Sequence, residues 1–233
     1  MATMWEKIRT LTPRKALRYL EYCLVTAPDV AIDLLVCGRV LAKSVPSPFH
    51  DDRRGVGMTA SQPAHYAILR RILGGVELTE SDSFLDVGCG KGRVLAYMLR
   101  RKCPCKISGI ELSEEPARVA SEWVTRYPKV EVIRGDALQL DYSPYTALFL
   151  SRPFLPKTFL EFVDRLEATV GHRVTLVYWV DQQSGHLLRG RSGWTMLRHG
   201  TLYKVHGLRI AGSPQGWSVW EYEPVAREAL AGE

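Results

Sequence analysis

A glycine-rich turn between an apolar run and a helical run constrains the fold of this chain more than any other feature. Residues 84–93 read FLDVGCGKGR, which is typical of a short buried strand that turns directly into a helix. Gly88 and Gly90 would let the backbone approach a ligand, and Gly92 would let the helix pack tightly on the strand. Because ligands of open α/β sheets bind at the carboxyl ends of the strands, the segment predicts a binding crevice here.

Strand and helix patterns alternate after residue 82. We expect strands over 83–87, 107–112, 130–133, 147–150 and 174–179, and helices over 94–99, 114–127 and 158–170. Strands separated by helices pair in parallel through right-handed crossovers. Two further strands, over 196–205 and 217–222, have no helix between them and predict an antiparallel hairpin at one sheet edge. The predicted fold class is therefore α/β, a doubly wound and mostly parallel sheet with an antiparallel C-terminal hairpin.

The first 48 residues predict an N-terminal helical arm or lid. Leu17, Leu20 and Leu24 recur close to the helical period. Pro28 is expected to break this helix, and Asp29 to cap a second helix that runs to about residue 42. The arm could close over an active site, form a homodimer through its helices or lie on a membrane surface. The sequence leaves these alternatives open.

Composition and charge bound the functional classes. Apolar residues make up 46% of the 233 residues and charged residues 24%, which is enough to bury the core of one large domain. The formal charge of +6 is spread along the sequence, so a nucleic-acid acceptor is not favoured. The five cysteines show neither a disulfide framework nor a zinc-binding spacing, and no metal is expected. Without a recognisable signal peptide or transmembrane segment, we expect a cytoplasmic protein.

Three acidic residues are expected to line the crevice. Asp86 stands two positions before Gly88, Glu111 ends the second strand 25 positions later, and Asp136 follows the third strand after another 25. Since the carboxyl ends of parallel strands meet at one edge of a sheet, these carboxylates should converge. A carboxylate after the second strand can accept hydrogen bonds from both hydroxyls of a ribose. The alternative is that the three residues cap helices or stabilise loops.

The motifs LDVGCGKG, GIEL and RGDA resemble the cofactor half of the class I S-adenosylmethionine-dependent methyltransferases, over residues 60–180. The resemblance implies a Rossmann-like sheet in a methyltransferase domain over 49–224, a tail over 225–233, and S-adenosyl-L-methionine as the cofactor. It also implies a set of cofactor-binding residues: Asp86, Gly88, Cys89 and Gly90 at the methionine portion, Glu111 at the ribose, Leu112, Asp136 and Ala137 at the adenine, and Ser151 beside the transferred methyl.

The acceptor is expected at the end of the fourth strand, where the sequence reads SRPF over residues 151–154. Many family members that methylate nitrogen have Asn or Asp, two prolines and an aromatic residue here. Arg152 has only donors, so it would suit an anionic acceptor unless it is a surface residue. A histidine can act as a general base near neutral pH. The candidate catalytic residues are Ser151, Arg152 and His65, and the candidate acceptor-binding residues are Tyr66, Arg152, Phe154 and Tyr178.

Residues 57–63, which read GMTASQP, are similar to the Thr-x-Ser-x-Pro segment of the protein isoaspartate O-methyltransferases. The alternative is a loop that folds over the cofactor. We therefore predict a methyltransferase that acts on N or O of a small molecule or peptide. Protein carboxylate O-methylation and a non-catalytic module that binds S-adenosylmethionine are the alternatives.

Overall fold

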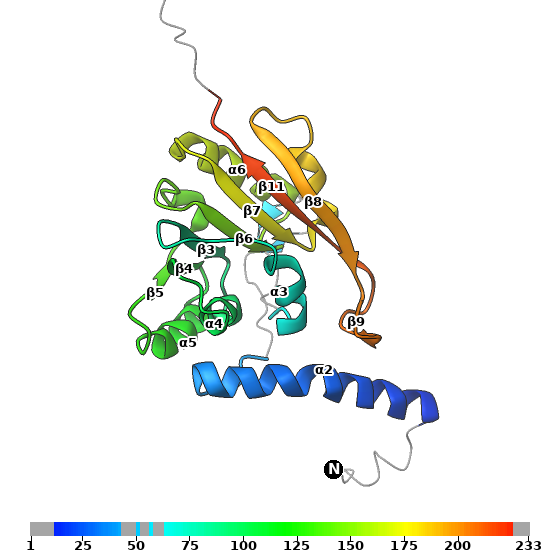
Figure 1. Cartoon of the computed structure of the whole chain (residues 1–233). Coiled ribbons are helices and arrows are strands. Elements are labelled where there is room, and N and C mark those ends of the chain that lie inside the picture. Colours follow the sequence, from blue (N-terminus) through cyan, green and yellow to red (C-terminus); the bar gives the residue numbers. More distant parts are fainter. Residues whose placement is uncertain (1–11, 43–49, 52–55, 58–62, 226–233) are drawn as a thin grey trace, which may run out of the picture.

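A seven-stranded sheet organises the protein (Figure 1). The computed structural model describes residues 12–42, 50–51, 56–57 and 63–225. The sheet order is β5-β4-β3-β6-β7-β11-β8. Its parallel strands are β3 (Ser83–Val87), β4 (Lys106–Glu111), β5 (Val130–Arg134), β6 (Ala147–Ser151) and β7 (Val174–Trp179). Strand β11 (Gln215–Tyr222) pairs antiparallel with both β7 and β8 (Trp194–Leu202), which confirms the predicted mostly parallel sheet with a C-terminal hairpin at one edge.

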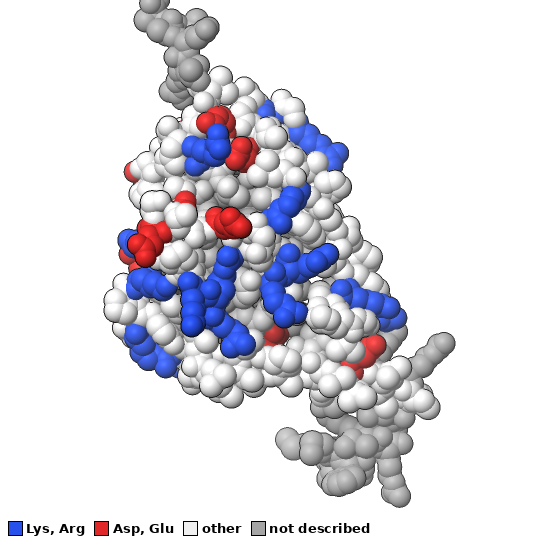
Figure 2. Space-filling view, in the orientation of Figure 1, with Lys and Arg blue, Asp and Glu red and all other residues white. Residues whose placement is uncertain are grey.

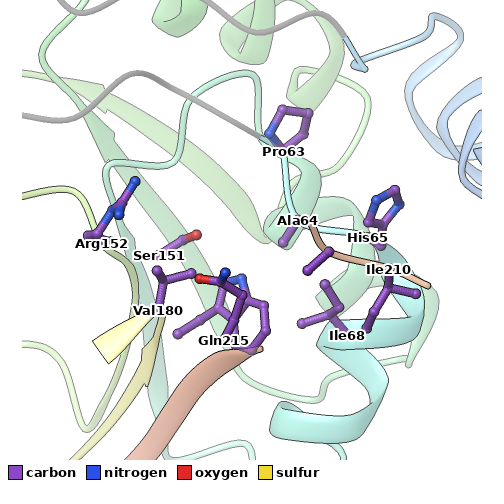
Figure 3. A pocket seen from close by; sticks show the side chains of 11 residues that line it. Pro63, Ala64, His65, Ile68, Ser151, Arg152, Val180, Ile210 and Gln215 are labelled. Carbon is purple, nitrogen blue, oxygen red and sulfur yellow. The ribbon is translucent and has the colours of Figure 1, made fainter. Parts of the chain in front are cut away.

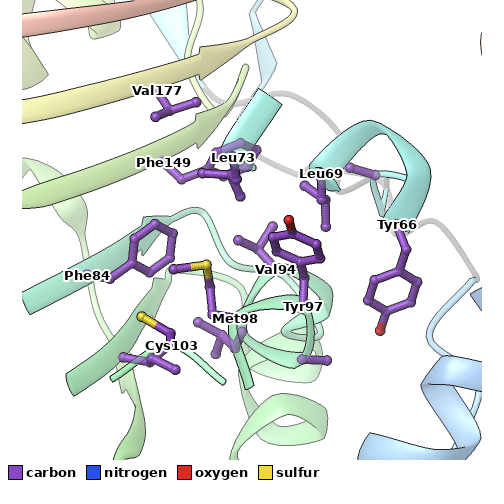
Figure 4. Close-up of a cluster of buried hydrophobic side chains, with 14 of the residues drawn as sticks. Tyr66, Leu69, Leu73, Phe84, Val94, Tyr97, Met98, Cys103, Phe149 and Val177 are labelled. Atoms are coloured by element: carbon purple, nitrogen blue, oxygen red, sulfur yellow. The ribbon is translucent and has the colours of Figure 1, made fainter. Parts of the chain in front are cut away.

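Helices cover both faces of the sheet, because alternate residues of its buried strands point to opposite sides. Helices α3 (Tyr66–Leu73), α4 (Arg93–Arg100) and α5 (Glu114–Val124) contribute to the core on one face. Figure 4 shows Phe84, Phe149 and Val177 of three strands beside Leu73 and Met98 of that layer. Helix α6 (Pro156–Thr169) fills the other face, where Leu85, Leu148 and Leu176 point.

Short elements connect these layers. They are the 3₁₀ segments η1 (Ala137–Gln139), η2 (Asp181–Gln183) and η3 (Gly185–Leu188), and two strand pairs, β1 (His50–Asp51) with β2 (Val56–Gly57) and β9 (Lys204–Val205) with β10 (Leu208–Arg209). Most of the GMTASQP segment, residues 58–62, lies outside the described residues. No helix in the described part of the chain is long and apolar enough to cross a membrane.

The arm is one helix, α2 (Pro13–Cys37), which corrects the predicted break at Pro28. A proline inside a helix costs roughly 3 kcal/mol, so the flanking turns must be held by other contacts. Val25, Ile32 and Val36 pack on the core from both sides of the proline. Asp29 does not cap the helix that contains it: its Oδ1 accepts a hydrogen bond from the backbone N–H of Tyr66, the first residue of α3 (3.0 Å).

A buried ion pair fastens α2 to the helix that follows the glycine-rich turn. Arg93, the first residue of α4, is 4% exposed and Asp33 is fully buried. Arg93 donates from Nη2 and Nε to the two oxygens of Asp33, at 2.6 and 3.2 Å. Asp33 also accepts hydrogen bonds from the Tyr66 hydroxyl and the Leu41 N–H, both at 2.9 Å. The described C-terminal half of the arm is therefore part of the domain core, and the division of the chain at residue 48 stays a prediction.

Candidate functional site

The glycine-rich turn joins three strands at the carboxyl edge of the sheet. The N–H groups of Gly88 and Cys89 both donate to the Ile110 carbonyl of β4, at 2.9 and 3.0 Å. Gly88 has φ of 75°, and a Cβ there would lie 2.8 Å from the Cβ of Pro153, just after β6. Only a glycine fits both the backbone conformation and the space. The turn is thereby fixed between β4 and the loop after β6.

Gly92 was expected to let the helix pack closely on the strand, but a different glycine, Gly109, has this role. A Cβ on Gly92 would lie 2.8 Å from the ring of Trp123 in α5, so Gly92 serves a helix–helix contact. A Cβ on Gly109 in β4 would lie 2.8 Å from Cys89 and 3.1 Å from Leu95 in α4. Gly109 therefore permits the close approach of helix and strand, because β4 is the strand over which α4 crosses.

Glu111 lies beside the glycine-rich turn, where the sequence predicts a binding crevice. It ends β4, is 8% exposed, and accepts hydrogen bonds from the Gly90 N–H at Oε2 and the Ser113 N–H at Oε1, both at 2.8 Å. These two N–H groups fix the carboxylate plane. Each oxygen keeps a second lone pair, so the carboxylate can still accept hydrogen bonds from a ligand.

Asp86 carries an unsatisfied oxygen at the same place. Its side chain is 2% exposed, and Oδ2 has no hydrogen-bond partner among the described residues. Burial, and then the neighbouring Glu111 carboxylate, raise the pKa of Asp86 well above its usual range. The same causes, burial first and then Asp86 and Glu111, raise the pKa of the Cys89 thiol. A cationic donor would satisfy the orphaned oxygen and offset the repulsion between the two carboxylates.

Asp136 follows β5, the third of the predicted strands. It makes a helix-capping contact, which was the alternative role considered for it from the sequence. Its Oδ1 accepts from the Leu138 N–H at 2.9 Å and so caps η1. The half-buried side chain keeps Oδ2 for another donor. Ala137 beside it is buried, and Leu112 is half-buried next to Glu111.

A cavity of about 320 Å³ lies at the ends of β6 and β7. Figure 3 shows Ser151 and Arg152 on one side, with His65 and Ile68 on the other. Arg152 and Val180 have φ of 44° and 59°, a conformation that costs a β-branched or bulky residue roughly 1–3 kcal/mol. Both strained residues follow directly on neighbouring strands and line the cavity, and backbone strain of this kind clusters at functional sites.

His65 reaches the rim of the cavity from the start of α3. Its Nδ1 lies 2.5 Å from Oδ2 of Asp29, a carboxylate that is 3% exposed. A carboxylate at Nδ1 favours the tautomer with the proton on Nδ1, which leaves Nε2 as the proton acceptor. The pair therefore has the arrangement of an oriented general base.

Three of the predicted acceptor-binding residues lie in the core and do not line this cavity. Tyr66 is buried with its hydroxyl on Asp33, and Phe154 stacks on Phe162 at 5.3 Å. Tyr178 is fully buried and stacks on Phe159, whereas the next residue, Trp179, lines the cavity. The alternation of side chains along β7 explains this difference.

Sequence reasoning missed five of the residues that line the cavity, and the carboxylate behind His65. The missed residues are Ile68, Val180, Ile210, Ala211 and Gln215, with Asp29 behind His65. The predicted hairpin at the sheet edge was the available signal for Gln215, because β11 lies next to β7. In the described part of the chain, no group of three His, Cys, Asp or Glu side chains is placed to hold a metal ion.

Comparisons with known proteins point to one family. A family profile described as a methyltransferase domain matches residues 84–159. The chain is 29% identical over 168 residues to protein-L-isoaspartate O-methyltransferase 2 of Pelobacter propionicus, over 69% of this chain and 70% of that protein. It is 29% identical over 86 residues to a probable ribosomal RNA small subunit methyltransferase A of Methanosarcina acetivorans, over 37% of this chain. The match spans 31% of that relative's length.

Solved structures share the fold. The mitomycin 7-O-methyltransferase MmcR superposes with a TM-score of 0.52 at 12% identity, over 68% of this chain and 53% of that chain. A structure from work on the conversion of a disulfide bond into a thioacetal group during echinomycin biosynthesis gives a TM-score of 0.50 at 16% identity, over 68% of this chain and 81% of that chain. These likenesses establish the Rossmann-like architecture of the sheet.

Proposed function

Since this chain belongs to the class I S-adenosylmethionine-dependent methyltransferase family, we propose that it transfers the methyl group of S-adenosyl-L-methionine to N or O of a small molecule or peptide. The observation that carries the proposal is the orphaned Oδ2 of Asp86, buried beside the glycine-rich turn and Glu111. An amino group is the donor that this oxygen lacks, and the methionine portion of the cofactor has one.

The residues around the crevice match the other parts of the cofactor. Glu111 offers the lone pairs that two ribose hydroxyls need, and the free Oδ2 of Asp136 can accept from an adenine amino group. Leu112 and Ala137 supply apolar contacts for the ring, and Gly88, Cys89 and Gly90 border the methionine portion. When bound, S-adenosylmethionine supplies an electrophilic methyl on a positively charged sulfur. The protein's task is to align that methyl with the acceptor and to exclude water.

The acceptor would occupy the cavity at the ends of β6 and β7. Ser151 joins the crevice to the cavity, and Arg152 next to it can hold an acceptor that carries a carboxylate or phosphate. His65 on the opposite side can take a proton at Nε2 from a hydroxyl or ammonium acceptor. Trp179 and Ile68 give the cavity apolar walls, so a partly apolar anion suits it best.

A second candidate function is the O-methylation of a carboxylate. The isoaspartate methyltransferase relative, which covers about two thirds of this chain, and the guanidinium in the cavity favour it. A carboxylate is already anionic and needs no base, whereas a hydroxyl or an ammonium must lose a proton. His65→Ala should therefore spare methylation of a carboxylate and abolish methylation of a hydroxyl or amine.

A nucleic-acid acceptor stays among the candidates. Figure 2 shows Lys and Arg side chains gathered over the face where α3 and α4 lie, although the sequence suggested a scattered charge. Exposed basic residues of α3 are Arg70 and Arg71, and those at the end of α4 and just after it are Arg100 and Lys102. The similarity to ribosomal RNA methyltransferases supports such an acceptor, but it spans only about a third of the length of those relatives.

The test is the formation of S-adenosylhomocysteine with acceptors of different chemistry. The purified chain would be incubated with S-adenosylmethionine and an isoaspartyl peptide, an aromatic carboxylic acid, a catechol, an aromatic amine or an RNA hairpin. We expect product with at least one anionic acceptor, and much less product with Glu111→Ala when S-adenosylmethionine is not saturating. Tight binding of S-adenosylmethionine without product from any acceptor would instead favour a non-catalytic binding module.

A further inference from the structure

Helix α2 turns an apolar surface outward. Of its residues whose side chains the structure describes, every exposed one is apolar or aromatic. Leu35 is 77% exposed, and Leu17 and Leu20 are 60% and 55% exposed. Of its charged residues whose side chains the structure describes, Asp29 and Asp33 are buried against the core and Glu21 is half-buried. A helix that is apolar on its outer side as well as its inner side is normally covered on both.

The exposed residues follow a regular repeat. The positions 13, 17, 20, 24, 27, 31 and 34 are separated alternately by four and three residues, and each is exposed. We call these residues the outer seam: Pro13, Leu17, Leu20, Leu24, Ala27, Ala31 and Leu34. A period of 3.5 residues is the pattern by which two helices pack knobs into holes. The seam extends about 32 Å along the helix.

The N-terminal half of the outer seam carries Leu17, Leu20 and Leu24, and the C-terminal half carries the small residues Ala27 and Ala31 before Leu34. If a second copy of α2 packs antiparallel about a two-fold axis between residues 25 and 26, Leu24 faces Ala27 of the partner subunit and Leu20 faces Ala31 of the partner subunit. Leu17 then faces Leu34 of the partner subunit. Facing a large with a small side chain fills the space between helices evenly. A parallel pair would instead place alanine against alanine at two successive layers.

We propose that the outer seam pairs with the outer seam of a second copy of this chain, in an antiparallel dimer. The arrangement is isologous, so one surface patch serves both subunits. In Figure 1, α2 lies at the edge of the molecule with its outer side away from the sheet, where a second copy can reach it. A standard interface buries roughly 800 Å² per partner, and the exposed leucines of the outer seam would supply the apolar centre of such a contact.

The size of the particle tests this pairing. Light scattering behind size-exclusion chromatography should give twice the 26.3 kDa of one chain at micromolar concentration. Leu20→Glu and Leu24→Glu should each give a monomer with an unchanged circular dichroism spectrum, because both leucines are exposed. Tyr22→Glu is the matched control: Tyr22 is 62% exposed on the same helix but lies off the seam, so this variant should remain a dimer.

The register is tested by cross-linking in a Cys23→Ser background, which removes the one cysteine of the described residues that is not buried. Chains with Leu20→Cys mixed with chains with Ala31→Cys should form a disulfide-linked dimer, and Leu20→Cys alone should not. A wild-type monomer at every concentration, or a dimer that survives Leu20→Glu, would overturn the proposal. Self-linking of Leu20→Cys would overturn the antiparallel arrangement. A monomer that sediments with phosphatidylglycerol vesicles, and loses this with Leu24→Glu, would assign the seam to a membrane surface instead.

Discussion

Asp33→Asn should destabilise the protein far more than a change at a surface ion pair. Asp33 is fully buried and accepts four hydrogen bonds, two of them from Arg93. Asparagine keeps the shape, but it turns an amide NH₂ toward these donors. Among the described residues, the Arg93 charge then keeps Asp29, at 3.6 Å from its Nη1, as its one carboxylate neighbour.

The size of the effect follows from burial. Breaking a buried ion pair by removing one partner costs about 3–5 kcal/mol, against a total stability of about 5–15 kcal/mol for a typical domain. With a urea slope of about 2–3 kcal/mol per molar, the unfolding midpoint should fall by about 1–2.5 M. Replacing both partners, as Asp33→Leu with Arg93→Met, should cost less than Asp33→Asn alone, because no buried charge is left unpaired.

Tryptophan fluorescence in urea, at one fixed protein concentration, measures these midpoints. The control is Arg39→Gln, which removes the half-exposed pair of Arg39 with Glu122 and should leave the midpoint nearly unchanged. A fall of less than about 0.3 M for Asp33→Asn corresponds to under about 1 kcal/mol. Such a result would refute the claim that the Asp33–Arg93 pair stabilises the packing of α2 on the domain.

Three further substitutions probe the crevice and the cavity. Asp86→Asn should raise the melting temperature of the cofactor-free protein near neutral pH, because ionising a carboxyl whose pKa is raised in the folded state reduces stability as the pH rises through that pKa. The same variant should weaken S-adenosylmethionine binding by about tenfold or more, and a variant that melts lower than wild type would contradict the assignment. Arg152→Lys should raise the KM of an anionic acceptor and leave the Kd of the cofactor unchanged, since lysine cannot make a bidentate contact; a loss of cofactor affinity alone would move Arg152 to the cofactor side. Gly88→Ala should lose both stability and cofactor affinity through contact with Pro153, whereas Gly207→Ala, with φ of 80° and open space around it, isolates the backbone strain; equal losses in the two would show that the contact is unimportant.

The fold could be predicted from the sequence because its signals are local. Each parallel strand is a short apolar run bounded by turns, and the glycine-rich turn identifies which strand ends face the ligand. The carboxylates Asp86, Glu111 and Asp136 follow from the same logic, since parallel strands present their carboxyl ends at one edge. Their convergence needs no knowledge of side-chain packing.

Interactions between distant segments could not be predicted in this way. Pro28 suggested a helix break because the contacts that hold α2 come from residues far along the chain, such as Arg93, which is 60 positions after Asp33. Asp29 was expected to cap a helix, and nothing in the sequence distinguished Asp33 from a surface carboxylate. Tyr178 and Trp179 show a further limit: a strand's alternation is visible, but the face toward the cavity is set by tertiary packing.

Titration calorimetry with S-adenosylmethionine and S-adenosylhomocysteine tests the assignment of the crevice most directly. The wild-type chain should bind each at a single saturable site. Glu111→Ala should weaken binding about 10- to 150-fold, which corresponds to the roughly 1.5–3 kcal/mol of charge-assisted hydrogen bonds. Glu114→Gln, three residues away and exposed in an ion pair with Arg134, is the matched control and should bind like wild type. No binding by the wild-type chain, or equal affinity in the folded Glu111→Ala variant, would contradict a cofactor site at the glycine-rich turn.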